Sequence, residues 1–287
     1  MRNRDRSMSI PVSFEFFPPN TPVGVEKLQA TSAALARWHP DFFSVTYGAG
    51  GASQEKTLQT VLDLQARGLD VAPHLSCIGG QREQIGSLLD RYRAAGIRRL
   101  VALRGDLPSG SGMSHGGEFR YACDLVRFVR EHSGRHFHIE VAAYPEKHPQ
   151  AASPAADLAA FVTKAEAGAD SAITQYFFNA DAYFRFRDEV QAAGVTIPLV
   201  AGVMPITNFT QLSRFSETCG AEIPRWIRTR LAGYGDDLDS IRAFGHEVVL
   251  GLCEKLVAGG TPGLHFYTLN QAAPTEALCA GLSLRRS

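Results

Sequence analysis

The stretch VAPHLSCIGGQREQIGSLLDRYRAAGIRRLVALR, residues 71–104, contains a strand, a helix and a second strand, and it indicates the fold of the chain. Val71–Leu75 is a short, mostly apolar run of the length that a buried strand needs. Gln81–Ala94 has apolar residues at helical spacing, and Gly96 follows as a helix stop signal. Leu100–Leu103 then predicts a second strand, which the intervening helix allows to run parallel to the first.

The same alternation of strand and helix continues along the chain. The expected strands are Val12–Phe16, Phe42–Thr46, Val71–Leu75, Leu100–Leu103, Phe137–Ala143, Ser171–Gln175, Ile197–Val203 and Gly263–Tyr267. The expected helices between them include Gly24–Arg37, Gln54–Arg67, Gln81–Ala94, Ala155–Ala167 and Ala180–Ala193. Regular alternation without a linker favours the α/β class and a (β/α)8 TIM barrel over a doubly wound sheet. Phe209–Gly259 exceeds one crossover, so we expect two or three extra helices between the seventh and eighth strands.

The composition is that of an ordinary soluble protein. The 287 residues include 29 basic and 29 acidic side chains, so there is no excess positive charge to bind nucleic acid. We expect residues 1–9 to be a flexible tail and residues 10–287 one domain, since such a barrel occupies about 250 residues. The five cysteines form no C-x-x-C pair, and no apolar run of about 20 residues could span a membrane. A cytoplasmic location is therefore expected.

The ends of the expected strands are unusually polar. In a barrel of this kind the active site lies at the C-terminal ends of the strands. The residues at these ends are Glu15, Thr46, His74, Arg104 with Asp106, Tyr144, Gln175 and Tyr267. A strand end can be polar simply because it emerges into solvent, but that explanation is weaker for the whole set than for any single residue.

In two of these strands, alternate residues divide the strand into two faces. Ser44 and Thr46 fall on one face of their strand, and Phe43 and Val45 fall on the other. Leu100, Ala102 and Arg104 likewise share a face, which continues to Asp106. This division is what an inside and an outside of a barrel require.

Glu15 lies among Phe14, Phe16, Phe17 and two prolines. Apolar surroundings disfavour the charged carboxylate, so we expect a raised pKa, which suits a general acid. Pairing with a nearby arginine such as Arg104 is an equally weighted alternative. Glu140 is a rival carboxylate, but its position is early in its strand and far from the C-terminal mouth.

Other motifs are weaker. Leu103–Pro108 resembles a glycine-containing ligand loop. His74 and His148 have no second histidine or cysteine at metal-ligand spacing, so hydrogen bonding is favoured and no metal site is predicted. The glycines at 48–51 do not form the G-x-G-x-x-G pattern of a dinucleotide-binding Rossmann fold.

Seven stretches of the chain carry a family resemblance. They are SFEFFPP (13–19), SVTYG (44–48), APHL (72–75), ALRGDLP (102–108), AAYPE with HP (142–146 and 148–149), AITQ (172–175) and HFYTLN (265–270). Together they resemble the methylenetetrahydrofolate reductase family in its short bacterial form, which consists of the catalytic barrel alone. The resemblance extends over nearly everything from Val12 to Leu282.

The resemblance implies a flavoenzyme with non-covalent FAD. NADH or NADPH would reduce the flavin and leave, and methylenetetrahydrofolate would then take its place and be reduced to methyltetrahydrofolate. By the resemblance, Glu15 would be the acid that opens the folate ring, and Asp106 would lie near the flavin, where its negative charge tunes the reduction potential. FAD contacts would be Thr46, Tyr47, Ala49, His74, Arg104, Gly105, Asp106, Ala122, Tyr144, His148, Ala151, Asp157 and Lys164. Gln175, Gln211, Phe215 and Tyr267 would form the site shared by folate and nicotinamide.

Several points stay open. Gln271, Ala160 and Thr163 depart from the family pattern at positions expected to contact the substrate tail or FAD. Phe215 is as consistent with a core position on an extra helix as with a ligand contact. A folate-binding barrel that transfers a carbon unit without redox chemistry is an alternative function, and a non-catalytic barrel subunit is another. A homo-oligomer is expected from the resemblance alone.

Overall fold

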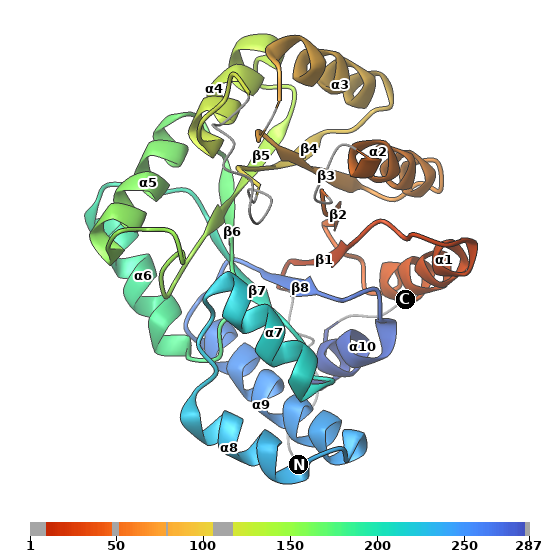
Figure 1. The fold of residues 1–287 in the computed structure, drawn as a ribbon, viewed down its shortest axis with the longest axis vertical. Coiled ribbons are helices and arrows are strands. Elements are labelled where there is room, and N and C mark those ends of the chain that lie inside the picture. The colour runs from red at the N-terminus through yellow and green to blue at the C-terminus, as the bar shows by residue number, and fades with distance from the viewer. Residues whose placement is uncertain (1–9, 48–51, 79, 106–116, 285–287) are drawn as a thin grey trace, which may run out of the picture.

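The computed structural model describes residues 10–47, 52–78, 80–105 and 117–284. In these residues, parallel strands pair in sequence order from β1 to β8, and β8 pairs with β1 to close a barrel (Figure 1). The expected (β/α)8 fold is therefore confirmed. The expected tail at residues 1–9 lies outside the described residues.

The strands are β1 (Val12–Phe16), β2 (Phe42–Val45), β3 (Val71–Ser76), β4 (Arg99–Leu103), β5 (His138–Ala143), β6 (Ser171–Thr174), β7 (Leu199–Val203) and β8 (Leu264–Tyr267). The helices are α1 (Pro22–Ala36), α2 (Ala52–Gln65), α3 (Arg82–Ala94), α4 (Ala122–Ser133), α5 (Pro154–Glu166), α6 (Ala180–Ala192), α7 (Phe209–Cys219), α8 (Arg225–Tyr234), α9 (Leu238–Ala258) and α10 (Ala272–Gly281).

Each expected strand is found, with ends that differ by at most two residues. The expected strand from Ile197 begins only at Leu199, because Pro198 has no N–H to donate to a neighbouring strand. The strand expected to end at Thr46 ends at Val45, although the Thr46 N–H still donates to the Phe16 carbonyl at 2.8 Å. Strand ends are the least regular part of the pairing, so periodicity locates them poorly.

Two apolar clusters lie on the two sides of the sheet. The larger one lies between the outer faces of the strands and the surrounding helices, and Leu100 and Ala102 belong to it. The smaller one consists of Phe42, Ala72, Val101 and Ile173, which come only from strands and fill the barrel interior. The inward face of β4 is therefore the face of Val101. Leu100 and Ala102 share one face, as their parity predicts, and it is the helix-covered face, which apolar parity alone does not distinguish from the interior one.

A buried ionic cluster closes the N-terminal end of the barrel. Glu140 is 1% exposed, forms an ion pair with Arg99 and lies 3.3 Å from His138 Nε2. Ser171 also donates a hydrogen bond to its carboxylate. Burial raises the pKa of Glu140, but His138, Arg99 and Ser171 together lower it below its ordinary value. A hollow of about 210 Å³ opens beside this cluster. Glu140 thus lies at the end of the barrel opposite the mouth, as its place in the strand predicts.

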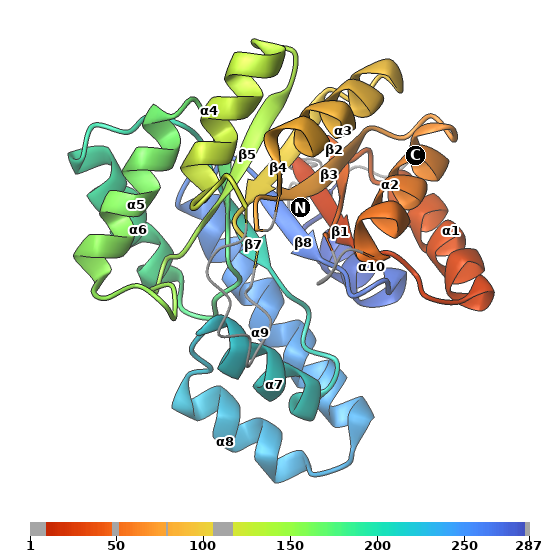
Figure 2. The same ribbon diagram turned by 45° about the horizontal axis from the view of Figure 1, so that its top comes forward.

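Residues 204–263, all of them described, contain the three helices α7, α8 and α9 between β7 and β8. The expected extra helices are therefore confirmed. They project to one side of the ring of strands, with α8 outermost in both views (Figures 1 and 2). Asn208 caps the start of α7 through a hydrogen bond from the Gln211 N–H, and Gly220 ends it in the left-handed conformation.

Candidate active site

Glu15 lies on the inward face of β1, in register with Ser44 of β2 and Tyr267 of β8. Its side chain is 16% exposed. The Nε2 atom of His74 lies 3.3 Å from Glu15 Oε2, and the Nε2 atom of His265 lies 3.6 Å from the same oxygen. Two histidines from β3 and β8 therefore converge on one carboxylate oxygen at the mouth of the barrel.

The contacts between these histidines and Glu15 are electrostatic. Neither Nε2 atom has a hydrogen-bond partner among the described residues, because the approach to the carboxylate is too long or too poorly aligned. The Nδ1 atom of His265 is 2.7 Å from Ser13 Oγ, which orients the ring. The result is a chain from Ser13 through His265 to Glu15, with His74 on the other side of the carboxylate.

The pKa of Glu15 contradicts our expectation. Burial by itself raises the pKa of this carboxyl, as its apolar neighbours suggest, but His265 and His74 outweigh that effect and lower the pKa to about 2. The alternative pairing with Arg104 is also wrong, since Arg104 forms its hydrogen bonds with Gln150 and with the Gly105 carbonyl. The sequence neighbours of Glu15 are apolar, but its neighbours across the barrel are imidazoles.

Tyr267 connects the acid to the end of β6. Its hydroxyl donates to the Thr174 carbonyl at 2.7 Å, and Thr174 directly precedes Gln175. Burial and then the charge of Glu15 hold the pKa of Tyr267 well above its ordinary value. Gly202 of β7 makes room for this ring, because an added Cβ would lie 2.8 Å from Tyr267 Cε2 and 2.0 Å from the Thr174 carbonyl oxygen. Glu15, Tyr267 and Gln175 therefore lie close together at the barrel mouth.

The segment between β5 and α5 gathers several of the expected FAD contacts. The rings of Tyr144 and His148 meet edge to face with centroids 4.6 Å apart. The His148 N–H donates to Asp157 of α5 at 2.8 Å, and the Ala151 N–H donates to the His148 carbonyl at 2.9 Å. These hydrogen bonds hold the segment in a fixed shape beside the barrel mouth.

Lys164 of α5 points its ammonium inward. The ammonium donates a hydrogen bond to the Ala142 carbonyl of β5. Burial lowers the pKa of Lys164 to about 8, against the opposing charge of Asp157. In the described part of the chain, no carboxylate lies within ion-pair distance of this ammonium. A buried cation without a paired anion is costly and suits an anionic ligand.

Gly105 fixes the end of β4 against β3. Its φ is 86°, and an added Cβ would lie 2.2 Å from Ser76 Oγ. Ser76 Oγ donates to the Arg104 carbonyl at 2.8 Å, so the two strand ends are joined here. Only glycine fits this conformation and this space.

The remaining expected contacts are more scattered. Thr46 and Tyr47 follow β2 and are half-buried, and Ala122 is the first residue of α4. Ala160 is exposed on α5, and the Thr163 hydroxyl bonds back to the Ala159 carbonyl. Ala49 and Asp106 lie outside the described residues.

Helix α7 presents the two remaining expected substrate residues. Gln211 is exposed, and Phe215 is 39% exposed. The alternative of Phe215 as a core residue is therefore wrong for the chain by itself. An exposed aromatic side chain beside a barrel mouth suits a ligand contact.

Ser13, Ser44 and His265 were not expected in the site. All three are buried on inward faces of β1, β2 and β8, and the Ser44 hydroxyl has no hydrogen-bond partner among the described residues. The HFYTLN stretch contains His265, but its ring reaches Glu15 only once β8 pairs with β1. Parity along β1, which puts Ser13 on the face of Glu15, was the available signal.

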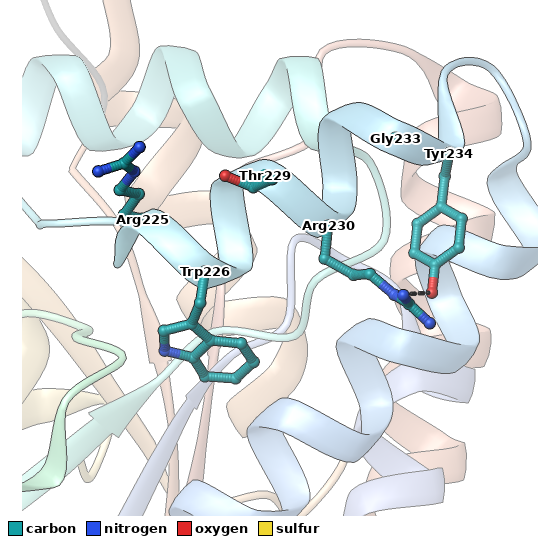
Figure 3. A pocket seen from close by; sticks show the side chains of 6 residues that line it. All are labelled: Arg225, Trp226, Thr229, Arg230, Gly233 and Tyr234. Atoms are coloured by element: carbon teal, nitrogen blue, oxygen red, sulfur yellow. Dashed lines mark hydrogen bonds between the residues drawn. The ribbon is translucent and has the colours of Figure 1, made fainter.

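A larger hollow lies away from the mouth. A surface depression of about 860 Å³ runs along α8 and is lined by Arg225, Trp226, Thr229, Arg230, Gly233 and Tyr234. Figure 3 shows that these side chains all come from one helix, with Arg230 Nε donating to Tyr234 Oη at 3.0 Å. Reactive groups do not converge here from several elements, so the barrel mouth is the better candidate for catalysis. No helix among the described residues is long and apolar enough to cross a membrane.

Fold and site together define a parallel-barrel enzyme with its candidate catalytic groups at the C-terminal mouth of the strands. The family model for methylenetetrahydrofolate reductase matches residues 1–283, and the chain belongs to that family.

Curated relatives agree with this membership, and a solved structure agrees with the fold. A 5,10-methylenetetrahydrofolate reductase of Pectobacterium carotovorum is 40% identical over 277 residues, which cover 96% of this chain and 91% of the relative. One of Escherichia coli K12 is 39% identical over 277 residues, or 96% and 92% of the two chains. Among solved structures, a Clostridium thermocellum protein that binds two copies of 5-methyl-5,6,7,8-tetrahydrofolic acid has a TM-score of 0.66 at 15% identity, covering 96% of this chain and 95% of that one. This last likeness shows the fold alone.

Proposed function

We propose that the protein reduces 5,10-methylenetetrahydrofolate to 5-methyltetrahydrofolate, with electrons from NADH or NADPH that pass through non-covalently bound FAD in two successive half-reactions. Family membership supports the folate reaction. The observation that carries the site assignment is the convergence of His74 and His265 on Glu15 at the mouth of the barrel.

The described residues fit a bound FAD. Lys164 offers a buried ammonium that suits a phosphate or ribose oxygen, and the Nε2 atom of His74 is a buried polar group without a hydrogen-bond partner in the described chain. Tyr144 and His148 offer ring edges on the β5–α5 segment. When bound, FAD would supply the two-electron carrier between nucleotide and folate, which no side chain of the protein can supply.

Glu15 would pass on to the folate the proton that opening of its ring consumes. At neutral pH the carboxyl is ionised, because its pKa is about 2. A proton must therefore come from a neighbour, and the imidazoles of His265 and His74 are the groups in contact with the carboxylate. Ser13 holds the far nitrogen of His265. Glu15, the two histidines and Ser13 together would supply the proton that the reaction consumes.

Gln175 and Tyr267 would orient the pterin, and Gln211 and Phe215 would cover it from α7. The Gln175 side-chain oxygen accepts the Tyr176 N–H at 3.0 Å, which leaves its amide N–H groups to face a ligand. Tyr267 borders both Glu15 and the end of β6. Folate and nicotinamide would occupy this space in turn.

The proposed function can be tested with the purified protein in the absence of oxygen. The purified protein should be yellow, NADH or NADPH should bleach the flavin absorbance, and methylenetetrahydrofolate should restore it. Parallel titrations with the two nucleotides determine which donor is preferred. A colourless protein that binds folate would instead support a non-redox one-carbon transferase. A protein that binds neither flavin nor folate would support a non-catalytic barrel subunit.

A cytoplasmic location and a homo-oligomeric assembly are also part of this proposal. Balanced charge and unpaired cysteines support the first. Sedimentation of the purified protein tests the second, since a monomer would contradict it.

A further inference from the structure

Helix α7 carries the two exposed residues that would contact the substrate, and an adjacent side of the helix is attached to the barrel mouth. Leu212, Ser216 and Cys219 lie on the attached side at helical spacing, and Leu212 and Ser216 are buried. Phe215 and Gln211 lie on the neighbouring, exposed side. Because a helix is rigid over one or two turns, whatever holds Ser216 in place also places Phe215.

Tyr176 makes the attachment in the C-terminal half of α7, at Ser216 and at the last helical residue, Cys219. Its oxygen is 3.0 Å from Ser216 Oγ, and the Cys219 thiol donates to the same oxygen at 3.3 Å. Since the thiol supplies a proton to the tyrosine oxygen, the tyrosine hydroxyl can donate its own proton to Ser216. Burial raises the pKa of Tyr176, so the hydroxyl keeps this proton at neutral pH. The three groups form one connected chain of hydrogen bonds.

The ring of Tyr176 reaches the other way, into the site. Tyr176 is 5% exposed and directly follows Gln175. Its ring lies edge to face with Tyr267, with centroids 6.2 Å apart. Tyr176 therefore contacts one expected substrate residue through its ring, adjoins another along the chain, and holds the helix that carries the other two.

A second attachment holds the C-terminal end of α7 against the β5–α5 segment. Glu146 accepts the Glu222 N–H at 2.7 Å. An added Cβ at Gly220 would lie 2.7 Å from Pro149 Cγ, so the helix end packs closely on the same segment. This attachment fixes the end of α7 but not its rotation about that end. The contacts of Tyr176 with Ser216 and Cys219, together with the buried Leu212, hold the helix in one rotation.

We propose that Tyr176 is a positioning residue for folate: its hydroxyl holds α7 so that Gln211 and Phe215 face Gln175 and Tyr267 across the barrel mouth. The identity of the ligand rests on the proposed function. The attachment itself rests only on the contacts of Tyr176 with Ser216 and Cys219.

The experiment removes one oxygen at a time. Tyr176→Phe keeps the ring and its contact with Tyr267 but breaks the chain to α7. The matched control is Tyr183→Phe, which removes another buried hydroxyl, one that bonds the Leu199 carbonyl at 2.7 Å and Thr261 at 3.1 Å, away from α7. Ser216→Ala and the double variant complete a mutant cycle.

The first readout is hydrogen–deuterium exchange of the protein as purified, without folate. Tyr176→Phe should speed exchange in α7 by about three- to tenfold, the effect of losing one or two hydrogen bonds. Tyr183→Phe should leave α7 unchanged. Equal exchange of α7 in wild type and Tyr176→Phe would overturn the proposal, and so would an equal increase in both variants.

The second readout is turnover. The KM for methylenetetrahydrofolate should rise about three- to tenfold in Tyr176→Phe, while kcat and the rate of flavin reduction at saturating nucleotide change by less than about twofold. Ser216→Ala should raise KM similarly, and the double variant should be no worse than Tyr176→Phe. Additive effects would contradict a connected chain. If the wild-type protein neither binds nor turns over folate, the proposed function is wrong. The exchange experiment would still show whether Tyr176 holds α7 in place.

Discussion

The Nε2 atom of His74 on β3 lies 3.3 Å from Oε2 of Glu15 on β1, although β2 separates the two strands. The contact crosses the interior of the closed barrel, where both side chains point inward. Together with His265 from β8, it makes Glu15 a carboxylate shared by two imidazoles. The predictions below begin with this cluster.

Glu15→Gln should separate the two half-reactions. Nucleotide-driven flavin reduction should stay within about twofold of wild type, and folate reduction should fall about 10²- to 10⁴-fold, the usual contribution of a general acid. Stopped-flow absorbance of the flavin measures both steps. Glu140→Gln is the control: it changes the other buried carboxylate, beside Arg99, and should lower stability by about 1.5–3 kcal/mol without affecting either half-reaction. Equal loss of both half-reactions in Glu15→Gln would argue against the acid role.

The contribution of Glu15 to stability should depend on pH. The folded pKa is lowered to about 2, so the ionised carboxylate stabilises the folded state above the unfolded pKa, and this stabilisation is lost as pH falls toward 2. Urea unfolding of wild type and Glu15→Gln should therefore differ most above about pH 5, since an unfolded glutamate titrates near about 4.3. The difference should shrink by about pH 3. A difference that grows as the pH falls would mean that the histidines do not lower this pKa.

Asp106→Asn tests a residue that lies outside the described part of the chain. Removing negative charge beside a flavin makes the flavin easier to reduce, so we expect a higher reduction potential and slower folate turnover. Spectroelectrochemical titration of the purified protein measures the potential. An unchanged potential would place Asp106 away from the ring.

Lys164→Met should weaken FAD binding. It should also make the free energy of unfolding less dependent on pH in the alkaline range. Burial lowers the pKa of Lys164 to about 8, so the unfolded chain binds more protons between about pH 8 and the ordinary lysine value of about 10.4. The FAD-free protein should therefore gain stability as pH rises through this window, and the variant should lose that gain. Urea unfolding from pH 7.5 to 10 measures this change in stability with pH. Lys255→Met, at an exposed position on α9, should keep the wild-type slope.

Gly202→Ala should disturb Tyr267. The added Cβ would lie 2.0 Å from the Thr174 carbonyl oxygen and 2.8 Å from Tyr267 Cε2, so backbone and ring must move. We expect a loss of about 1–3 kcal/mol of stability, the usual cost of overpacking, and a higher KM for folate. Gly251→Ala on α9, where an added Cβ meets nothing within 4 Å, should be neutral or stabilising. Thermal unfolding that ranks the two variants in the opposite order would contradict this account.

Much of the fold could be predicted because each strand and helix carries its own local signal. Val12–Phe16 is found with the expected bounds, and the long interval after β7 holds extra helices. The candidate site was predicted less completely. Glu15, His74, Gln175 and Tyr267 lie at strand ends, where barrel geometry places them near one another. His265 and Ser13 were missed because their role depends on a contact between the first and last strands.

The sequence by itself determined the order of strands and helices, the polar mouth and the family, because these depend on patterns read along the chain. Only the tertiary structure decided the charge state of Glu15 and the attachment of α7. Apolar sequence neighbours predicted a raised pKa, but electrostatic energy depends on distance in space, and His74 and His265 are close only after the barrel closes. The hydroxyl of Tyr176 meets Ser216 for the same reason: the folded chain brings together residues that no local pattern connects.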